Sequence, residues 1–211
     1  MKYGRLIVCD GSNGAGKSSV IEHLAKWLVD RGREVVVARE PGGTLISEAI
    51  RKMLLNPEEK NIGDRTELLL FAAARAQNVK ENIKPALQSG KVVICDRFTP
   101  ATVAFQHFMR GLPLDLVHAV NDCALDGISP DLNIIFDIDP LVAMERVTGR
   151  GQKLDRFELT KAELLARARH GFVYQAQSNP EKFRLIDASK SFEEVSNEVV
   201  KIVEDLLKTF D

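Results

Sequence analysis

Asp10-Gly-Ser-Asn-Gly-Ala-Gly-Lys-Ser18 is the stretch that decides the fold of this chain of 211 residues. It fits the pattern G-x-x-x-x-G-K-[ST], which begins at Gly11 and ends at Ser18. A short apolar run at residues 5–9 precedes it, and residues 19–31 carry apolar side chains at helical spacing. Strand, glycine-rich loop and helix in this order predict a phosphate-binding loop.

The predicted loop has the chemistry to hold a polyphosphate. Its glycines let backbone N–H groups turn inward, and the N-terminus of the following helix adds positive potential. Lys17 can reach the β- and γ-phosphates, and the Ser18 hydroxyl can bind Mg²⁺. A glycine turn before a helix is the alternative, but the flanking strand and helix make a chance match of the pattern rare. The nucleotide-binding residues are then expected to be Gly11, Ser12, Asn13, Gly14, Ala15, Gly16, Lys17, Ser18 and Ser19.

The composition is that of an ordinary globular protein. Hydrophobic residues make up 45% and charged residues 28%, and the length suits one domain with a full core. The net charge of −1 gives no bulk attraction to nucleic acid or to an acidic membrane, so an anionic ligand needs locally grouped cations. The three cysteines lack metal-type spacing, and neither a signal peptide nor a membrane-spanning run is found. We therefore expect a cytoplasmic protein that binds neither nucleic acid nor membranes.

Apolar runs and amphipathic stretches alternate along the sequence. This alternation predicts a parallel sheet with helices on both faces. Residues 148–157 contain two glycines and few apolar side chains, so they are expected to form a mobile loop. Strands are expected at residues 5–9, 35–38, 91–95, 133–137 and 183–186. Helices are expected at residues 19–31, 45–55, 65–87, 99–109, 114–125, 140–147, 158–177 and 192–207.

Distinctive sequences directly follow four of the predicted strands. They are the glycine-rich loop, Arg39-Glu-Pro-Gly-Gly43, Asp96-Arg-Phe98 and Asp137-Ile-Asp139. Because the carboxyl ends of parallel strands share one edge, these sequences should lie together at the edge where ligands bind. Asp96 is expected to serve Mg²⁺ directly or through water, with a helix cap as its alternative role. Arg97 adds a cation at the same edge.

Two other groups of side chains could complete such a site. Arg146, Arg150 and Arg156 stand around the glycine-containing loop, where they could close over phosphates and stabilise a transferring phosphoryl group. A solvated, charged loop is an equally good interpretation of that composition. Phe71 and Arg75 lie four residues apart on a predicted helix, so they could stack on a base and donate to its carbonyl group. Spacing alone favours the alternative, a core phenylalanine beside a surface arginine.

The order of these motifs resembles that of thymidylate kinases. The resemblance covers nearly the whole chain, and its most specific motif is Arg39-Glu-Pro-Gly-Gly-Thr44. It implies a P-loop NTPase-like, three-layer fold with a five-stranded parallel sheet, organised as one domain over residues 1–211 with a lid at about 147–157. It also implies transfer of the γ-phosphate of ATP to dTMP, a need for Mg²⁺ and a homodimer. Further motifs that carry it are Leu70-Phe-Ala-Ala-Ala-Arg75, Ala104-Phe-Gln106, Pro130-Asp-Leu132 and Leu154-Asp-Arg156.

The resemblance also implies roles for single residues. The glycine-rich loop would hold ATP, and Ser18 and Asp96 would serve Mg²⁺. Phe71 would stack on thymine, Arg75 would address its O4, and Phe105 would press against the sugar. The catalytic residues that it implies are Lys17, Asp96, Arg97, Arg150 and Arg156. The dTMP site that it implies consists of Asp10, Arg39, Pro41, Phe71, Arg75, Arg97, Ala101, Phe105 and Gln106.

Three positions depart from the usual pattern of that family. Asn13 stands where an acidic residue is common near the 3′-hydroxyl, which should weaken dTMP binding by about 1 kcal/mol. Ala101 replaces a frequent serine near the base, and Thr148 stands where another lid arginine is common. Gly14 occupies the loop position at which some members carry the catalytic arginine, so the bacterial pattern with a lid arginine applies.

Two other functions are compatible with a phosphate-binding loop. The first is a kinase for a deoxynucleoside or another nucleoside monophosphate, although Phe98 stands where deoxynucleoside kinases typically have serine. The second is a non-catalytic, nucleotide-binding relative or switch. A non-catalytic relative would be expected to lose Lys17 or Asp96, and both are present. The Asn-Lys-x-Asp motif of guanine-binding switches is absent from the sequence.

Overall fold

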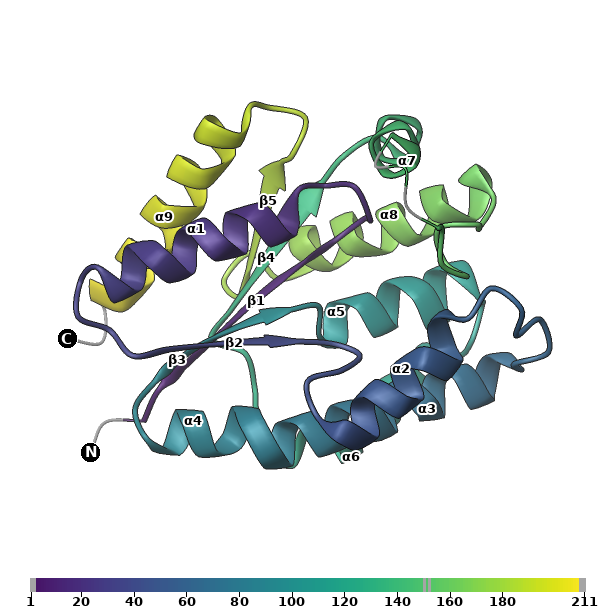
Figure 1. Ribbon diagram of the computed structural model, residues 1–211, viewed down its shortest axis with the longest axis horizontal. Coiled ribbons are helices and arrows are strands. Elements are labelled where there is room, and N and C mark those ends of the chain that lie inside the picture. Colours follow the sequence, from purple (N-terminus) through teal and green to yellow (C-terminus); the bar gives the residue numbers. More distant parts are fainter. Residues whose placement is uncertain (1–2, 150, 152, 209–211) are drawn as a thin grey trace.

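A computed structural model describes residues 3–149, 151 and 153–208 of the chain (Figure 1). A five-stranded sheet runs through the middle of the molecule in the order β2-β3-β1-β4-β5, and every neighbouring pair of strands is parallel. The prediction of a five-stranded parallel sheet is therefore confirmed. The strands are β1 (Arg5–Gly11), β2 (Val35–Arg39), β3 (Val92–Asp96), β4 (Leu132–Asp137) and β5 (Phe183–Asp187).

Helices cover both faces of the sheet, which confirms the predicted three-layer arrangement (Figure 1). On one face lie α1 (Lys17–Val29) and α9 (Phe192–Lys208), whose apolar side chains join those of the sheet in one core cluster. On the other face lie α4 (Lys84–Gln88) and α8 (Ala162–Ser178). The sheet is therefore shielded from water on both sides, as parallel sheets require.

The side chains of β1 alternate between these two cores. Ile7 and Cys9 pack with α1 and α9, while Leu6 and Val8 pack on the side of α4. All four side chains are completely buried. This double burial explains the unbroken apolar run in the sequence, and it makes β1 a rigid support for the glycine-rich loop at its carboxyl end.

Two of the predicted helices contain a π-helical segment. Residues 65–87 lie within α3 (Asp64–Asn78), η1 (Val79–Ile83) and α4, which follow one another without a break. Residues 99–109 form α5 (Thr99–Thr102) and η2 (Val103–Met109). A π segment has i→i+5 hydrogen bonds, so it departs from the regular spacing of an α-helix and is frequent at functional sites.

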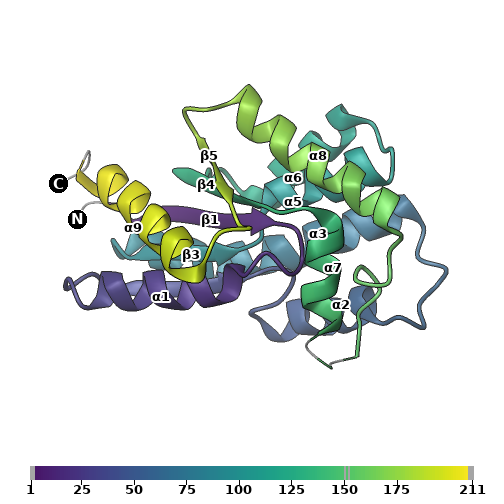
Figure 2. The same cartoon turned by 90° about the horizontal axis from the view of Figure 1, so that it is seen from above.

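Two helices frame the carboxyl edge of the sheet. Figure 2 shows α2 (Leu45–Leu55) and α7 (Pro140–Thr148) beyond the carboxyl end of β1. On the side of α4, α6 (Leu114–Leu125) packs against α3. Within the described part of the chain, no helix combines the length and the apolar character that a bilayer crossing needs.

The prediction that a helix begins at Glu158 is wrong. The Asp155 carboxylate accepts hydrogen bonds from the backbone N–H groups of Phe157 (2.8 Å) and Glu158 (2.9 Å), which holds this segment in a turn. The helix α8 begins only at Ala162. The loop before it is therefore longer than expected, and its end is fixed close to the carboxyl edge of the sheet.

Candidate active site

A cavity of about 520 Å³ lies at the carboxyl edge of the sheet. The loops after β1, β2 and β3 contribute to its wall, together with α2, α3, η2 and residues 155–158. Its volume is in the range of sites for small molecules and cofactors. The residues predicted from the sequence that line it are Asn13, Gly14, Gly16, Lys17, Ser18, Ser19, Arg39, Pro41, Phe71, Arg75, Asp96, Arg97, Ala101, Phe105 and Gln106.

The cavity has two chemically different halves. We call the part lined by Lys17, Arg39, Arg51, Asp96 and Arg97 the cationic half. We call the part lined by Phe71, Arg75, Phe105, Gln106 and Phe157 the aromatic half. Asp137-Ile-Asp139, the fourth sequence that was expected at this edge, does not line either half of the cavity. The Asp137 carboxylate pairs with Arg169 of α8 (2.7 Å), and Asp139 caps α7.

The N-terminus of α1 faces the cationic half, and no side chain accepts a hydrogen bond from its first backbone N–H groups. Gly16 is the N-cap residue in a left-handed conformation, no side chain caps it, and the first turn contains no acidic residue. Ser18 and Ser19 are exposed there. Free N–H groups and the helix dipole together make such an end suitable for binding an anion.

Lys17 folds back onto the loop that precedes it. Its Nζ donates hydrogen bonds to the carbonyl oxygens of Gly11 (3.2 Å) and Ser12 (2.8 Å), and the residue is only 7% exposed. Burial, together with the nearby Arg97 guanidinium, lowers the pKa of Lys17 to about 7. An anion bound beside Lys17 would oppose both effects, so the site suits a negatively charged ligand.

Asp10 lies beneath the cavity and organises its floor. One carboxylate oxygen accepts from the backbone N–H of Gly11 (2.9 Å) and from Arg97 Nη1 (3.2 Å), and the other accepts from the N–H groups of Phe98 (3.1 Å) and Ala101 (2.9 Å). Asp10 is completely buried and does not line the cavity. Its oxygens hold Arg97 and the start of α5 in place, so Asp10 acts on the cavity through these neighbours.

Arg97 is held in an unusual backbone conformation. Its φ angle is 68°, in the left-handed region that favours glycine. Its guanidinium donates to the carbonyl oxygen of Gly11 (3.0 Å) and to Asn13 Oδ1 as well as to Asp10. Strain of this kind is concentrated at functional sites, where surrounding contacts keep the side chain in place.

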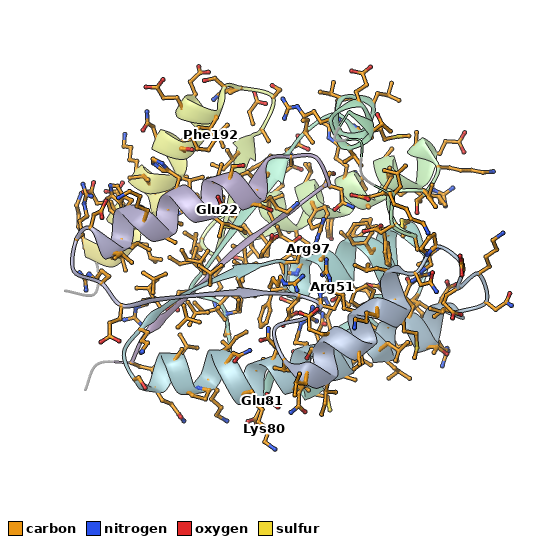
Figure 3. The ribbon with its side chains drawn as sticks, in the orientation of Figure 1. Glu22, Arg51, Lys80, Glu81, Arg97 and Phe192 are labelled. Carbon is orange, nitrogen blue, oxygen red and sulfur yellow. The ribbon has the colours of Figure 1, made fainter. Side chains whose placement is uncertain are left out.

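Arg51 is a cavity cation that sequence reasoning missed. It lies on α2, its Nη1 donates to the carbonyl oxygen of Pro41 (2.7 Å), and it reaches the cationic half together with Arg97 (Figure 3). Burial, and next the nearby Arg39 guanidinium, lower the pKa of Arg51. A signal was present, since Arg51 shares a helix face with the buried Ser47 and Leu54.

Asp96 offers a carboxylate that no described residue engages in a hydrogen bond or ion pair. It lines the cavity at the end of β3, and the exposed Ser18 lines it as well. Among the described residues, no group of three or more metal-ligating side chains occurs. This donor set fits Mg²⁺, which usually binds to one or two protein groups, waters and phosphate oxygens.

Aromatic rings and one buried ion pair form the aromatic half. Phe157 packs edge-on against Phe71 (centroids 5.7 Å apart) and Phe105 (5.6 Å). Arg75 is 2% exposed, donates through Nε to Glu40 (2.7 Å) and donates through Nη1 to Asn121 (2.6 Å). Its Nη2 has no hydrogen-bond partner among the described residues, so one donor remains for a ligand. Phe157 was not predicted as a cavity residue.

The predicted lid arginines have different outcomes. Arg156 donates through Nε to the carbonyl oxygen of Leu54 (2.8 Å) and through Nη2 to the buried Glu67 (2.5 Å). It does not line the cavity, so its expected contact with phosphate would require these bonds to break. Arg146 donates to the carbonyl oxygen of Ala188 (3.0 Å), and Arg150 lies outside the described residues.

Gly14 allows a close contact between the loop and α7. Its φ angle is 79°, and a Cβ atom at this position would lie 2.4 Å from the carbonyl oxygen of Ala143. An arginine at position 14 would therefore need both a strained backbone and a displaced α7. This geometry disfavours an arginine at position 14, so a cation that acts on the phosphates would have to come from another segment, such as the loop after α7.

Comparisons with known proteins all point to one family. A family model described as thymidylate kinase matches residues 9–199. A thymidylate kinase of a Geobacillus species is 39% identical over 206 residues, which are 97% of this chain and 98% of that protein. One from Pelotomaculum thermopropionicum is 41% identical, with 98% and 96% covered. A crystal structure of thymidylate kinase from Ehrlichia chaffeensis has 31% identity and a TM-score of 0.77, and the match covers 95% of this chain and 99% of that one.

Proposed function

This chain belongs to the thymidylate kinase family, an enzyme family that transfers a phosphoryl group from ATP to dTMP, and we propose that this transfer takes place in the 520 Å³ cavity. The observation that carries the proposal is that Lys17 and Phe71 line the same cavity. A nucleoside triphosphate bound at Lys17 and a pyrimidine bound at Phe71 can therefore occupy the same cavity.

The donor nucleotide would bind at the glycine-rich loop. The free N–H groups at the start of α1 and the Lys17 ammonium group would hold its phosphates, with the backbone from Gly11 to Ser19 around them. Mg²⁺ would be held by Ser18 and Asp96, and when bound it neutralises charge on the phosphates. Lys17 would leave the carbonyl oxygens of its own loop to reach the anion.

The acceptor would lie across the cavity with its phosphate in the cationic half. Arg39, Arg51 and Arg97 would hold that phosphate, while Pro41 and Ala101 would line its surroundings. In the aromatic half, Phe71 would stack on thymine, Phe105 would contact the sugar, and the free Nη2 of Arg75 would donate to O4.

The reaction would be an in-line transfer. An oxygen of the dTMP phosphate attacks the γ-phosphorus of ATP, a new P–O bond forms, and the bond to ADP breaks. The acceptor oxygen is already an anion, so the protein has to position the two nucleotides and neutralise charge, and no general base is needed. Lys17 and Arg97 are the described cations best placed for this task.

The lid, at about residues 147–157, would supply a further cation. Because Arg156 is bound to Glu67 and to the carbonyl oxygen of Leu54, we assign it an anchoring role at the base of the lid. Arg150 would then approach the transferring phosphoryl group. We treat residues 1–211 as one domain, and we propose a cytoplasmic location for it.

The proposed homodimer would form through α2 and α3. Ile46, Met53 and Leu69 are each at least half exposed, and Ala73 is exposed one helical turn after Leu69. Small and apolar side chains on two adjacent helices suit close packing against a second copy. Analytical ultracentrifugation should give a dimer for the wild type and a monomer for Ala73→Glu.

A panel of acceptors tests the proposed site. With ATP and Mg²⁺ supplied, we expect the highest kcat/KM for dTMP, lower values for dCMP, and the lowest for thymidine, which lacks the phosphate that the cationic half would bind. Phe71→Ala should lower kcat/KM for dTMP with little change in the KM for ATP. Equal use of dTMP and thymidine would contradict the assignment of the cationic half, and an unaltered Phe71→Ala enzyme would contradict that of the aromatic half.

A further inference from the structure

Glu67 gathers side chains from two separate parts of the chain behind the aromatic half. It lies on α3, is 1% exposed and does not line the cavity. Its Oε1 accepts from Gln106 Nε2 (3.0 Å) and Arg110 Nε (3.1 Å), and its Oε2 accepts from Arg110 Nη2 (3.1 Å) and Arg156 Nη2 (2.5 Å). One buried carboxylate thus connects η2 with the end of the lid.

This contact fixes the orientation of the Gln106 side-chain amide. A carboxylate oxygen only accepts hydrogen bonds, so the amide must direct its NH₂ group toward Glu67. The amide oxygen then points away from Glu67, and it has no hydrogen-bond donor among the described residues. Gln106 is itself 1% exposed, yet it lines the cavity. The cavity wall therefore carries an acceptor at this point.

The wall of the same cavity also carries a donor. Arg75 has an unused Nη2, while its Nε and Nη1 are held by Glu40 and Asn121. A donor and an acceptor in one cavity suit thymine, which presents the O4 acceptor beside the N3–H donor. Cytosine presents an amino donor and an unprotonated N3 at these places, so both contacts would be mismatched. The amide orientation at Gln106 would therefore decide half of this match.

We propose that Glu67 is a positioning residue for base selection, which acts by holding the Gln106 amide with its oxygen toward the base. The inference rests on the proposed base site in the aromatic half, and it adds a residue that no ligand would touch. Arg110 and Arg156 contribute by holding the Glu67 carboxylate in place from its other side.

The test compares Glu67→Met with Gln106→Leu, using the ratio of kcat/KM for dTMP to kcat/KM for dCMP. Methionine keeps the size of the side chain and removes the acceptor, so the Gln106 amide can turn and present either group. We expect the ratio to fall about tenfold or more in each variant, the size expected when a hydrogen bond to the base is no longer selective. The KM for ATP should stay close to that of the wild type, and most of the change should appear in the KM for dTMP.

Two further variants make the result specific. Because Glu67 would act only through Gln106, adding Glu67→Met to Gln106→Leu should lower the ratio little further. Glu67→Gln keeps one acceptor oxygen and should retain part of the preference. Glu59→Met makes the same chemical change at an exposed position and should leave the ratio unchanged.

The outcomes separate this inference from the proposed function. If Gln106→Leu lowers the ratio and Glu67→Met lowers both kcat/KM values by one common factor, Glu67 only supports the fold and the inference is wrong. If neither variant changes the ratio, the base site itself is wrong. If Glu67→Met does not fold, the double variant Glu67→Met/Arg110→Met leaves no unpaired charge from this ion pair. Its ratio of kcat/KM for dTMP to kcat/KM for dCMP then tests the inference.

Discussion

The two halves of the cavity treat charge in opposite ways. In the aromatic half, Arg75 forms a buried ion pair with Glu40 at 2.7 Å. In the cationic half, Arg97 and Arg39 pair with Asp10 and Glu48. Lys17 and Arg51 instead hydrogen-bond to backbone carbonyl oxygens, and no described carboxylate pairs with either of them. One half therefore balances its charge within the protein, while the other keeps an excess of positive charge.

This difference corresponds to the ligands that the two halves are expected to hold. A base is neutral, so the aromatic half must be rigid and complete before the base arrives. A phosphate is an anion, so the cationic half can leave its charges to be neutralised by the ligand. Burial, and next a neighbouring guanidinium, lower the pKa values of Lys17 and Arg51, and a bound phosphate would oppose both effects.

The largest effect on stability is expected in the aromatic half. Arg75→Met leaves the Glu40 carboxylate buried without its partner, which should lower the free energy of unfolding by about 3–5 kcal/mol. Urea unfolding measures this loss. Arg65→Met, at an exposed position of the same helix, is the control and should change the value by less than about 0.5 kcal/mol. A similar small loss in Arg75→Met would show that the ion pair does not hold this half together.

In the cationic half, the corresponding change should affect activity and not folding. Lys17→Met removes a cation that would contact phosphate, so turnover should fall by about 10²–10³-fold. The same change relieves the desolvation of a buried cation, so the ligand-free variant should unfold at no lower urea concentration than the wild type. Lys26→Met, on the exposed side of α1, should be neutral in both assays. If Lys17→Met were less stable than the wild type, the cationic half would contribute to folding as the aromatic half does, and the proposed difference between the two halves would be wrong.

The pKa of Lys17 also predicts how stability depends on pH. It is lowered from 10.5 to about 7 in the folded protein, so the unfolded chain binds more protons between these two values. The free energy of unfolding of the wild type should therefore rise with pH relative to Lys17→Met, by about 1.4 kcal/mol for each pH unit between about pH 7 and 9. Urea titrations of both proteins at several pH values measure this difference. Parallel pH profiles would mean that Lys17 has an ordinary pKa.

The smallest of these effects is expected at Arg51. Its replacement in Arg51→Met should raise the KM for dTMP about tenfold, because one charged hydrogen bond to the acceptor phosphate is lost. Since Arg51 has no carboxylate partner among the described residues, its loss should cost little stability. Lys52→Met makes the same change of charge on the exposed side of α2 and serves as the control. Equal KM values in the two variants would remove Arg51 from the acceptor site.

The cationic half was largely predictable from the sequence. Lys17, Arg39, Asp96 and Arg97 stand in motifs that follow strands, and parallel topology brings the ends of strands to one edge. The apolar runs in the sequence located all five strands to within two residues before their order in the sheet was known. Arg51 escaped because α2 is a separate helix, and nothing in the motif order says which of its faces meets the cavity.

The contacts behind the aromatic half could not be predicted in this way. Glu67 lies on one helix face with Phe71 and Arg75, at intervals of four residues, but its partners come from η2 and from the lid. The direction of Gln106 depends on a π-helical segment, which the regular spacing of an α-helix does not encode. Arg156 was expected at the phosphates because it stands in the predicted lid. Its pairing with Glu67 could not be foreseen, since that buried carboxylate lies on a distant helix and no local pattern in the sequence links the two residues.

The left-handed backbone at Arg97 has an evolutionary consequence. A residue with a Cβ atom at φ 68° makes the protein less stable by about 1–2 kcal/mol than glycine would. Glycine would relieve this strain but would leave the buried Asp10 carboxylate without its partner, a loss of about 3–5 kcal/mol, so a library of variants selected only for resistance to heat should not accumulate glycine at position 97. Arginine at this position therefore serves both the fold and the cationic half, so tolerance to heat and catalytic power depend together on this single residue.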